Sequence, residues 1–101
     1  MAKHPSMLHK LVHKRFHEVF GGPDITLGRD DHWSLKPSKN SISINILVNG
    51  TGEKPAIWVF DPFSKTDGVL RELISNEKEL NKVIKQIQQR LKLAGQYYRD
   101  A

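Results

Sequence analysis

The sequence predicts an α+β fold of two layers, in which an N-terminal helix, a three- to four-stranded antiparallel meander and a C-terminal amphipathic helix follow one another. Apolar residues recur with a helical period near both ends of the chain. Between them, residues 41–48 alternate between apolar and polar side chains, which is the period of a strand with one exposed face. Each helix has one apolar side, and so does the sheet. All of these sides are buried if both helices pack on the apolar face of the sheet.

The chain of 101 residues is long enough for one domain with one modest core. We expect residues 1–101 to form this domain, with an ordered core over residues 6–95 and a frayed tail over residues 96–101. No apolar run is long enough to cross a membrane, and the N-terminus lacks the apolar segment of a signal peptide. The absence of cysteine excludes disulfides and Cys-based zinc sites, and favours a reducing, cytoplasmic location.

The first helix is expected over residues 6–20. Ser6 follows Pro5 and is a suitable N-cap, and the glycines and proline at positions 21–23 end the helix. One side of this helix is apolar and comprises Leu8, Leu11, Val12, Phe16, Val19 and Phe20. We expect that side to face the sheet.

The first strand is expected at residues 32–36, with Trp33 and Leu35 on one face. The preceding residues, 24–32, have a sequence from which the secondary structure is ambiguous. Residues 28–31 within that stretch have the composition of a turn.

The clearest strand is expected at residues 41–48. Its buried face should comprise Ile42, Ile44, Ile46 and Val48. The intervening positions are polar except for Leu47, which we expect on the exposed face. Residues 49–52 have the composition of a hairpin turn, so the next strand should return antiparallel.

The returning strand covers residues 55–61 and is apolar on both faces. Its apolar residues form one pair on each face: Ile57 with Val59, and Trp58 with Phe60. Because a half-exposed strand would be polar on one face, we expect this strand to be central or covered.

The last helix follows a loop over residues 61–68 and a segment at residues 69–74 that is either a fourth, edge strand or an irregular approach; we favour the strand. Asn76 and Glu79 form a capping box, in which each side chain accepts a hydrogen bond from the other residue's backbone N–H. Gly95 is expected to end the helix. Its apolar arc comprises Leu80, Val83, Ile84, Ile87, Leu91 and Ala94.

Basic residues outnumber acidic ones by 16 to 11, which gives a formal net charge of +5. This surplus favours an anionic partner. Two helical surfaces carry it. The first comprises Lys10, Lys14 and Arg15, and the second is a row on the outer face of the last helix, comprising Lys78, Lys82, Lys85 and Lys92.

We therefore expect a small non-enzymatic binding module whose two basic helical surfaces contact the phosphates of nucleic acid. The alternative is a protein-interaction module, an adaptor or inhibitor that docks on an acidic protein surface and has no nucleic-acid role. Its contacts would be the exposed sheet edge and Leu47. A third interpretation is that the lysines only keep the helix faces hydrated. No membrane partner is expected, and the sequence indicates no oligomeric state.

Three histidines, His9, His13 and His17, recur every four residues beside the apolar side of the first helix. Two imidazoles one turn apart can share a metal ion, so the three are candidate ligands. The only carboxylate at ligand spacing is Glu18, which points about 100° away around the helix. The H-E-x-x-H pattern is absent. We therefore expect boundary histidines, and no metal or other cofactor.

Four aspartates are candidate ligands of a catalytic Mg²⁺: Asp30, Asp31, Asp61 and Asp67. No D-x-K or E-x-K motif accompanies them, although nucleases built on a helix, three strands and a helix use such a lysine to polarise the attacking water. Asp61 is expected to be a turn or cap residue. The chain is therefore predicted not to be an enzyme.

The strand aromatics are a further candidate for contact with bases. Trp33, Trp58, Phe60 and Phe63 could stack on nucleobases. Aromatic residues on strands more often pack in the core or pair across strands, and we favour that interpretation.

Overall fold

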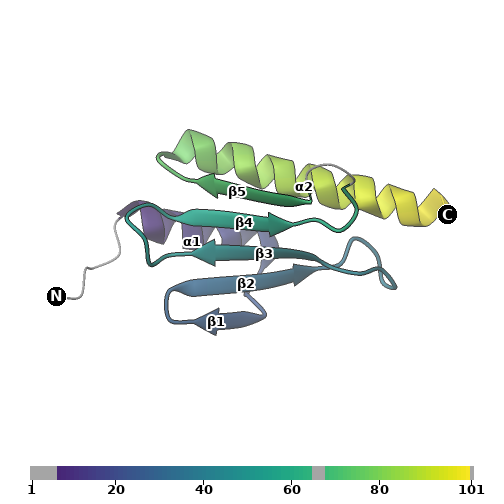
Figure 1. Cartoon of the computed structure of the whole chain (residues 1–101), viewed down its shortest axis with the longest axis horizontal. Helices are drawn as coiled ribbons and strands as arrows, with labels where there is room; N and C mark the ends of the chain where they lie inside the picture. Colours follow the sequence, from purple (N-terminus) through teal and green to yellow (C-terminus); the bar gives the residue numbers. More distant parts are fainter. Residues whose placement is uncertain (1–6, 65–67, 101) are drawn as a thin grey trace.

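The structure, a computed structural model, describes the backbone of residues 7–64 and 68–100 and the side chains of the same residues up to 96. Two helices and five strands lie in this part of the chain (Figure 1). They are α1 (Met7–Phe20), β1 (Ile25–Leu27), β2 (Asp30–Leu35), β3 (Ile44–Asn49), β4 (Ala56–Phe60), β5 (Val69–Leu73) and α2 (Glu77–Asp100). The predicted α+β order is confirmed, with one strand more than the three or four expected. No described helix combines the length and apolar character needed to span a membrane.

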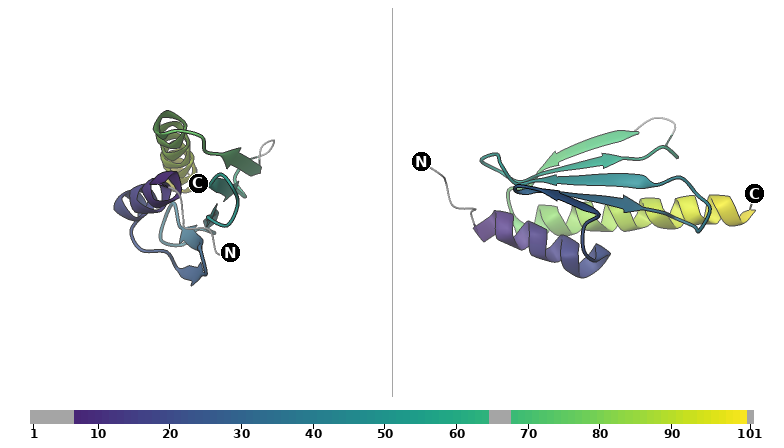
Figure 2. Two further views of the ribbon diagram at one scale, coloured as in Figure 1. Left: turned by 90° about the vertical axis from the view of Figure 1, so that its left-hand side faces the viewer. Right: turned by 90° about the horizontal axis from the view of Figure 1, so that it is seen from below.

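The strands form one antiparallel sheet in the order β1-β2-β3-β4-β5, so every strand pairs with its neighbours in sequence. Both helices lie on the same face of this sheet, as predicted (Figure 2). No described helix or strand covers the opposite face, which we call the open face (Figures 1 and 2).

The core fills the space between the sheet and the two helices. The largest fully buried side chains include Phe16 of α1, Trp33, Ile44, Ile46 and Ile57 of the sheet, and Leu80 and Ile87 of α2. Burial of each such side chain contributes about 1.5–3 kcal/mol to folding. The apolar sides predicted for both helices are confirmed, since their remaining members are buried or pack against this cluster.

β1 is the strand that the sequence did not resolve. It occupies part of the ambiguous stretch, and Ile25 and Leu27 are 52% and 73% exposed. Both apolar residues of this edge strand lie on the open face, so neither contributes to the core. A strand this short with no buried face has no clear period of two, which explains why the sequence pattern did not reveal it. Asp30 and Asp31 were expected in a turn, but they pair with β3 as the first residues of β2.

β3 begins later than predicted, and Ile42 is not on its buried face. The first ladder pair of β3 joins Ile44 to Leu35, and Ile42 is 57% exposed. The reason is a turn in which the Ser41 hydroxyl donates to the Ser38 carbonyl at 3.0 Å and accepts from the Ser38 N–H at 3.1 Å. This turn holds the chain away from the sheet until residue 44.

β4 is central in the sheet, as its composition predicts, because it pairs with both β3 and β5. Its second apolar face is not covered, however, and Phe60 is 39% exposed. β5 is confirmed as an edge strand.

α2 starts at the predicted cap. The Asn76 Oδ1 atom accepts the Glu79 N–H at 2.9 Å, whereas the Glu79 carboxylate accepts the N–H of Ser75, not that of Asn76, at 3.0 Å. The helix does not end at Gly95 but continues to Asp100. Gly95 instead permits a close approach, since a Cβ there would lie 3.2 Å from the carbonyl oxygen of Pro37. The predicted N-cap of α1, Ser6, lies outside the described residues.

Candidate functional site

The predicted lysine row lies on the exposed side of α2. Its members, Lys78, Lys82, Lys85 and Lys92, are all exposed. None of the four has an ion pair or a hydrogen bond with another described residue. Because their charges are not neutralised within the described chain, they are available to an external anion.

The basic surface of α1 is partly neutralised. Glu18 lies 4.0 Å from the Lys14 Nζ atom and 3.3 Å from an Arg15 guanidinium nitrogen. Lys10 is exposed and has no such partner among the described residues. In the structure, α2 therefore carries more unpaired positive charge than α1.

A groove of about 1310 Å³ runs along α2 beside the loop that follows β4. Its apolar lining includes Phe63, Leu70 and Leu93. Two residues of the lysine row, Lys82 and Lys85, also line it, together with the amides of Gln86 and Gln89. The groove therefore combines apolar surface with positive charge and hydrogen-bonding groups.

Asp61 fixes the wall of this groove. One carboxylate oxygen accepts the Phe63 N–H at 2.9 Å, which confirms the predicted turn role. The other oxygen lies 2.8 Å from a guanidinium nitrogen of Arg90 on α2, and Asp61 is only 6% exposed. The sequence did not predict this pair, because Asp61 and Arg90 are 29 positions apart.

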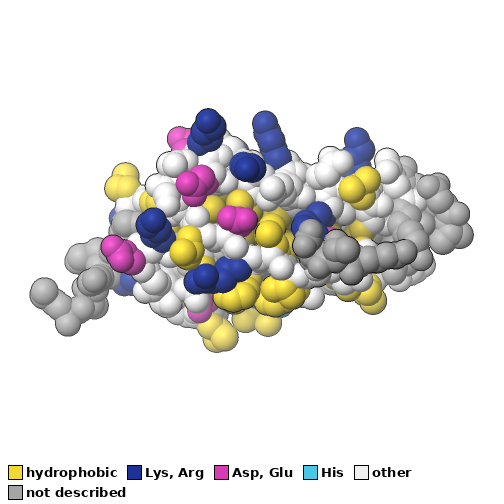
Figure 3. Space-filling model, turned by 45° about the horizontal axis from the view of Figure 1, so that its top comes forward, with side chains coloured by type: hydrophobic (Ala, Val, Ile, Leu, Met, Phe, Trp, Pro, Cys, Tyr) yellow, Lys and Arg dark blue, Asp and Glu magenta, His cyan; other side chains and the backbone are white. Residues whose placement is uncertain are grey.

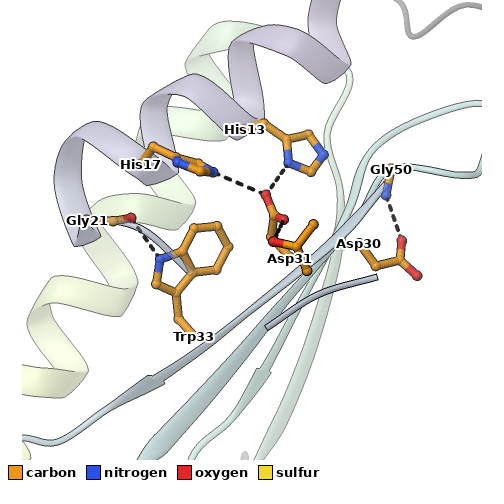
Figure 4. Close-up of polar contacts among 8 residues, drawn as sticks. His13, His17, Gly21, Asp30, Asp31, Trp33 and Gly50 are labelled. Atoms are coloured by element: carbon orange, nitrogen blue, oxygen red, sulfur yellow. Dashed lines mark hydrogen bonds and ion pairs between the residues drawn. The ribbon is translucent and has the colours of Figure 1, made fainter. Parts of the chain in front are cut away.

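The histidines of α1 meet a carboxylate of β2 (Figure 4). The Oδ2 atom of Asp31 lies 2.8 Å from His13 Nδ1 and 3.2 Å from His17 Nε2. The Oδ1 atom accepts the hydroxyl of Thr26 at 2.8 Å. Asp31 is nearly buried between α1 and the sheet, so these contacts join the two layers.

The pKa of Asp31 lies below its ordinary value of 3.8. Burial raises the pKa, but hydrogen bonds from Thr26, His13 and His17 favour the ionised form more strongly. The group is therefore a carboxylate at neutral pH. For both imidazoles to donate to it, His13 carries its hydrogen on Nδ1 and His17 on Nε2.

His9 does not join this cluster, since its Nε2 atom lies 2.9 Å from the carbonyl oxygen of Gly52. Within the described residues, no group of three or more potential ligands could hold a metal ion. The carboxylate that His13 and His17 contact is Asp31, which comes from β2 and lies outside the spacing of a single helix. The alternation that places Trp33 inward also places Asp31 inward, and this signal could have identified it.

The other aspartates are separate from one another. Asp30 accepts the N–H of Gly50, in the turn after β3, at 3.2 Å. Asp61 pairs with Arg90 at the opposite end of the strands. Asp67 lies outside the described residues. A Cβ at Gly50 would lie 2.7 Å from the Arg29 carbonyl oxygen and 2.9 Å from His13 Nε2, so the chain is closely packed beside the histidines.

The aromatic residues divide between the core and the open face. Trp33 is buried, as favoured from the sequence. Its ring is tilted by 44° against that of Phe16, and its ring N–H donates to the Gly21 carbonyl at 3.0 Å. Phe63 packs against the core from the groove side. Trp58 and Phe60 lie on the open face and pair across strands, Trp58 with Leu47 and Arg71 and Phe60 with Asn45 and Val69. This is the second of the two arrangements favoured from the sequence.

Comparison with protein-family models, with curated proteins and with solved structures finds no match for this chain. The interpretation of the site therefore depends on its own geometry and charge. The features that stand out are the unpaired lysine row of α2, the groove beside it, and the uncovered sheet face.

Proposed function

We propose that this protein is a small, non-enzymatic binding module that contacts nucleic acid, with the lysine row of α2 as its principal contact. The observation that carries the proposal is the absence of any described partner for Lys78, Lys82, Lys85 and Lys92. An unpaired row of ammonium groups binds successive phosphates and releases their counter-ions. Lys10, Lys14 and Arg15 of α1 supply a second, weaker contact, since Glu18 competes for two of them.

The groove beside the row supports a partner that is more than a simple anion. It offers apolar surface from Phe63 and Leu93 next to the lysines, and amide groups from Gln86 and Gln89. Nucleic acid presents phosphates, flat apolar base faces and hydrogen-bonding base edges within a few ångströms of one another. These three kinds of group match the three kinds of lining.

The alternative function is a protein-interaction module without a nucleic-acid role. The observation that favours it is the exposure of apolar residues on the open face, where Phe60, Val69 and Leu73 are 39%, 60% and 44% exposed. Contiguous exposed apolar surface often marks a protein interface. Direct binding to oligonucleotides separates the two proposals, because the protein-interaction module has no nucleic-acid role.

The test is fluorescence anisotropy with labelled DNA and RNA oligonucleotides at salt concentrations between about 50 and 200 mM. We expect affinity to fall steeply with salt. The double variant Lys82→Glu/Lys85→Glu should lose affinity by about tenfold or more. The slope of log affinity against log salt concentration should become shallower by about one for each lysine replaced, since each lysine contacts one phosphate.

The matched control is Lys36→Glu/Lys39→Glu, which changes the net charge by the same amount at exposed positions outside the lysine row and outside the lining of the groove. It should lose much less affinity, since only the long-range attraction changes. Absence of binding at low salt, or an equal loss in both double variants, would overturn the proposal.

A further inference from the structure

An aromatic pair on β4 lies on the open face. Trp58 and Phe60 occupy alternate positions of β4 and therefore stand on the same side of the sheet. Their rings are parallel to within 5°, and the ring centroids are 6.2 Å apart. Phe60 is exposed and Trp58 is half-buried, although both helices and the core lie on the other face.

Arg71 places a positive charge on this pair. It is opposite Trp58 in the β4–β5 ladder, and its guanidinium carbon lies 5.2 Å from the centre of the Trp58 ring. Arg71 is exposed and has no ion pair with any described carboxylate. The cation–π contact orients the guanidinium but leaves its charge available to an anion.

Polar groups border the rings on the β3 side. Asn45 is opposite Phe60 in the ladder, and its Oδ1 atom accepts the hydroxyl of Ser34 at 3.0 Å. This bond fixes the amide, while no described residue pairs with its Nδ2 group. A donor held beside an exposed ring is suited to hydrogen bonding at the edge of a planar ligand.

The open face is connected to the groove along α2. Two shallow hollows of about 550 and 560 Å³ adjoin the rings, one beside Trp58 and Arg71 and the other beside Phe60 and Asn45. The second hollow and the α2 groove share four lining residues, namely Ile42, Asp61, Pro62 and Ser64. Figure 3 shows hydrophobic side chains gathered on this side of the molecule, next to Lys and Arg side chains.

We propose that the open face is a base-stacking platform for single-stranded nucleic acid. Bases stack on Trp58 and Phe60, and the sugar-phosphate backbone continues past Pro62 and Ser64 to Lys82 and Lys85. The proposal rests on the proposed function and names the form of nucleic acid. Only unpaired bases expose the ring faces that an aromatic sheet surface can cover, because the bases of a duplex stack on one another.

Charge complementarity favours this occupant over a second copy of the chain. A dimer formed through the open faces would bring together two chains that each carry a net charge of +5, and would cover the exposed Arg71 of each. A polyanion with flat apolar groups complements both the parallel rings and the positive charges around them. The experiment must therefore distinguish self-association from binding of single-stranded nucleic acid.

The experiment measures the affinity for three probes: single-stranded oligo-dT, a DNA duplex of the same length, and inorganic polyphosphate, which has no bases. The variants are Trp58→Leu and Phe60→Leu, alone and combined, which keep an apolar side chain on the strand but remove the ring. The combined variant should lose single-strand affinity by about tenfold or more, with polyphosphate binding unchanged. Leu73→Ala is the matched control, since it removes apolar surface from the same face without removing a ring.

Tryptophan fluorescence gives a direct second readout. The chain has two tryptophans, and Trp33 is buried in the core, so quenching by oligo-dT should come from Trp58. Trp58→Phe should abolish the quenching but keep most of the affinity, because a ring remains. Polyphosphate should bind without quenching.

The outcomes separate the two proposals. If Lys82→Glu/Lys85→Glu weakens binding while Trp58→Leu/Phe60→Leu binds oligo-dT as tightly as the unmodified chain, the platform is wrong and the proposed function stands. If no probe binds at low salt, both are wrong. If the chain sediments as a dimer that Trp58→Leu/Phe60→Leu dissociates, the open face is a self-association surface and the platform is wrong.

Discussion

At the scale of single residues, Asp31 is the polar group on which most contacts converge. One of its oxygens receives two imidazoles of α1, and the other receives Thr26 of β1. A nearly buried carboxylate without such donors would be strongly destabilising, because its charge would be removed from water. The three donors offset that cost, and they tie the helix to the first two strands.

The lowered pKa of Asp31 predicts acid sensitivity. A carboxyl group whose pKa is lower in the folded than in the unfolded chain stabilises the fold above the unfolded value of about 3.8, and this contribution is lost as the pH falls through the folded pKa. Asp31→Asn should therefore lower the free energy of unfolding by about 1.5–3 kcal/mol at neutral pH. Below about pH 4, the free energy of unfolding of this variant should fall less steeply with pH than that of the unmodified chain. Urea unfolding across this pH range measures both effects.

The control for this prediction is Glu18→Gln, which removes an exposed carboxylate from α1, the helix that Asp31 contacts. It should change the free energy of unfolding at neutral pH by less than about 1 kcal/mol. The interpretation of Asp31 would be wrong if Asp31→Asn kept the same acid-side slope as the unmodified chain.

At the scale of elements, the start of α2 is defined by its cap. Asn76 accepts the Glu79 N–H, and Glu79 in turn accepts the Ser75 N–H, so two backbone donors at the helix start are satisfied. The cap orients the first turn, from which the lysine row begins at Lys78. The local sequence contains all of these groups within five positions.

Asn76→Ala should lower the free energy of unfolding by about 1 kcal/mol, since it leaves the Glu79 N–H without its acceptor. Thermal or urea unfolding followed by circular dichroism measures the change. Asn40→Ala, in an exposed loop, is the control and should be neutral. Equal effects of the two substitutions would contradict the assigned cap.

At the scale of the whole molecule, the two-layer arrangement gives the sheet two chemically different faces. Ile46 and Leu47 are neighbours on β3, but Ile46 is fully buried against the helices and Leu47 lies on the open face beside Trp58. The same kind of side chain is thus part of the core in one case and part of a surface in the other.

Ile46→Ala should cost about 2–5 kcal/mol, because it leaves a cavity between the layers. Leu47→Ala should cost less than about 1.5 kcal/mol, since water can fill the space it leaves. Denaturant titration of the two variants compares them directly. A cost for Leu47→Ala as large as that for Ile46→Ala would mean that the open face is covered in solution.

The sequence by itself determined the α+β class, both helices, the central strands and the lysine row of α2. These features follow from local patterns, since a period of 3.6 or 2 and a cap are set by residues a few positions apart. The exposed face of α2 was predictable because it is opposite the apolar arc on the same helix.

Only the tertiary structure decided which groups meet across the fold. Asp31 joins His13 and His17 because β2 starts two residues earlier than its apolar pattern indicates, and Arg90 reaches Asp61 because α2 crosses the end of β4. It also decided that the second apolar side of β4 stays uncovered, so that Phe60 is exposed and Trp58 is half-buried although both faces of their strand are apolar. Periodicity states that a strand has two apolar faces, whereas the number of layers available determines which of them is buried.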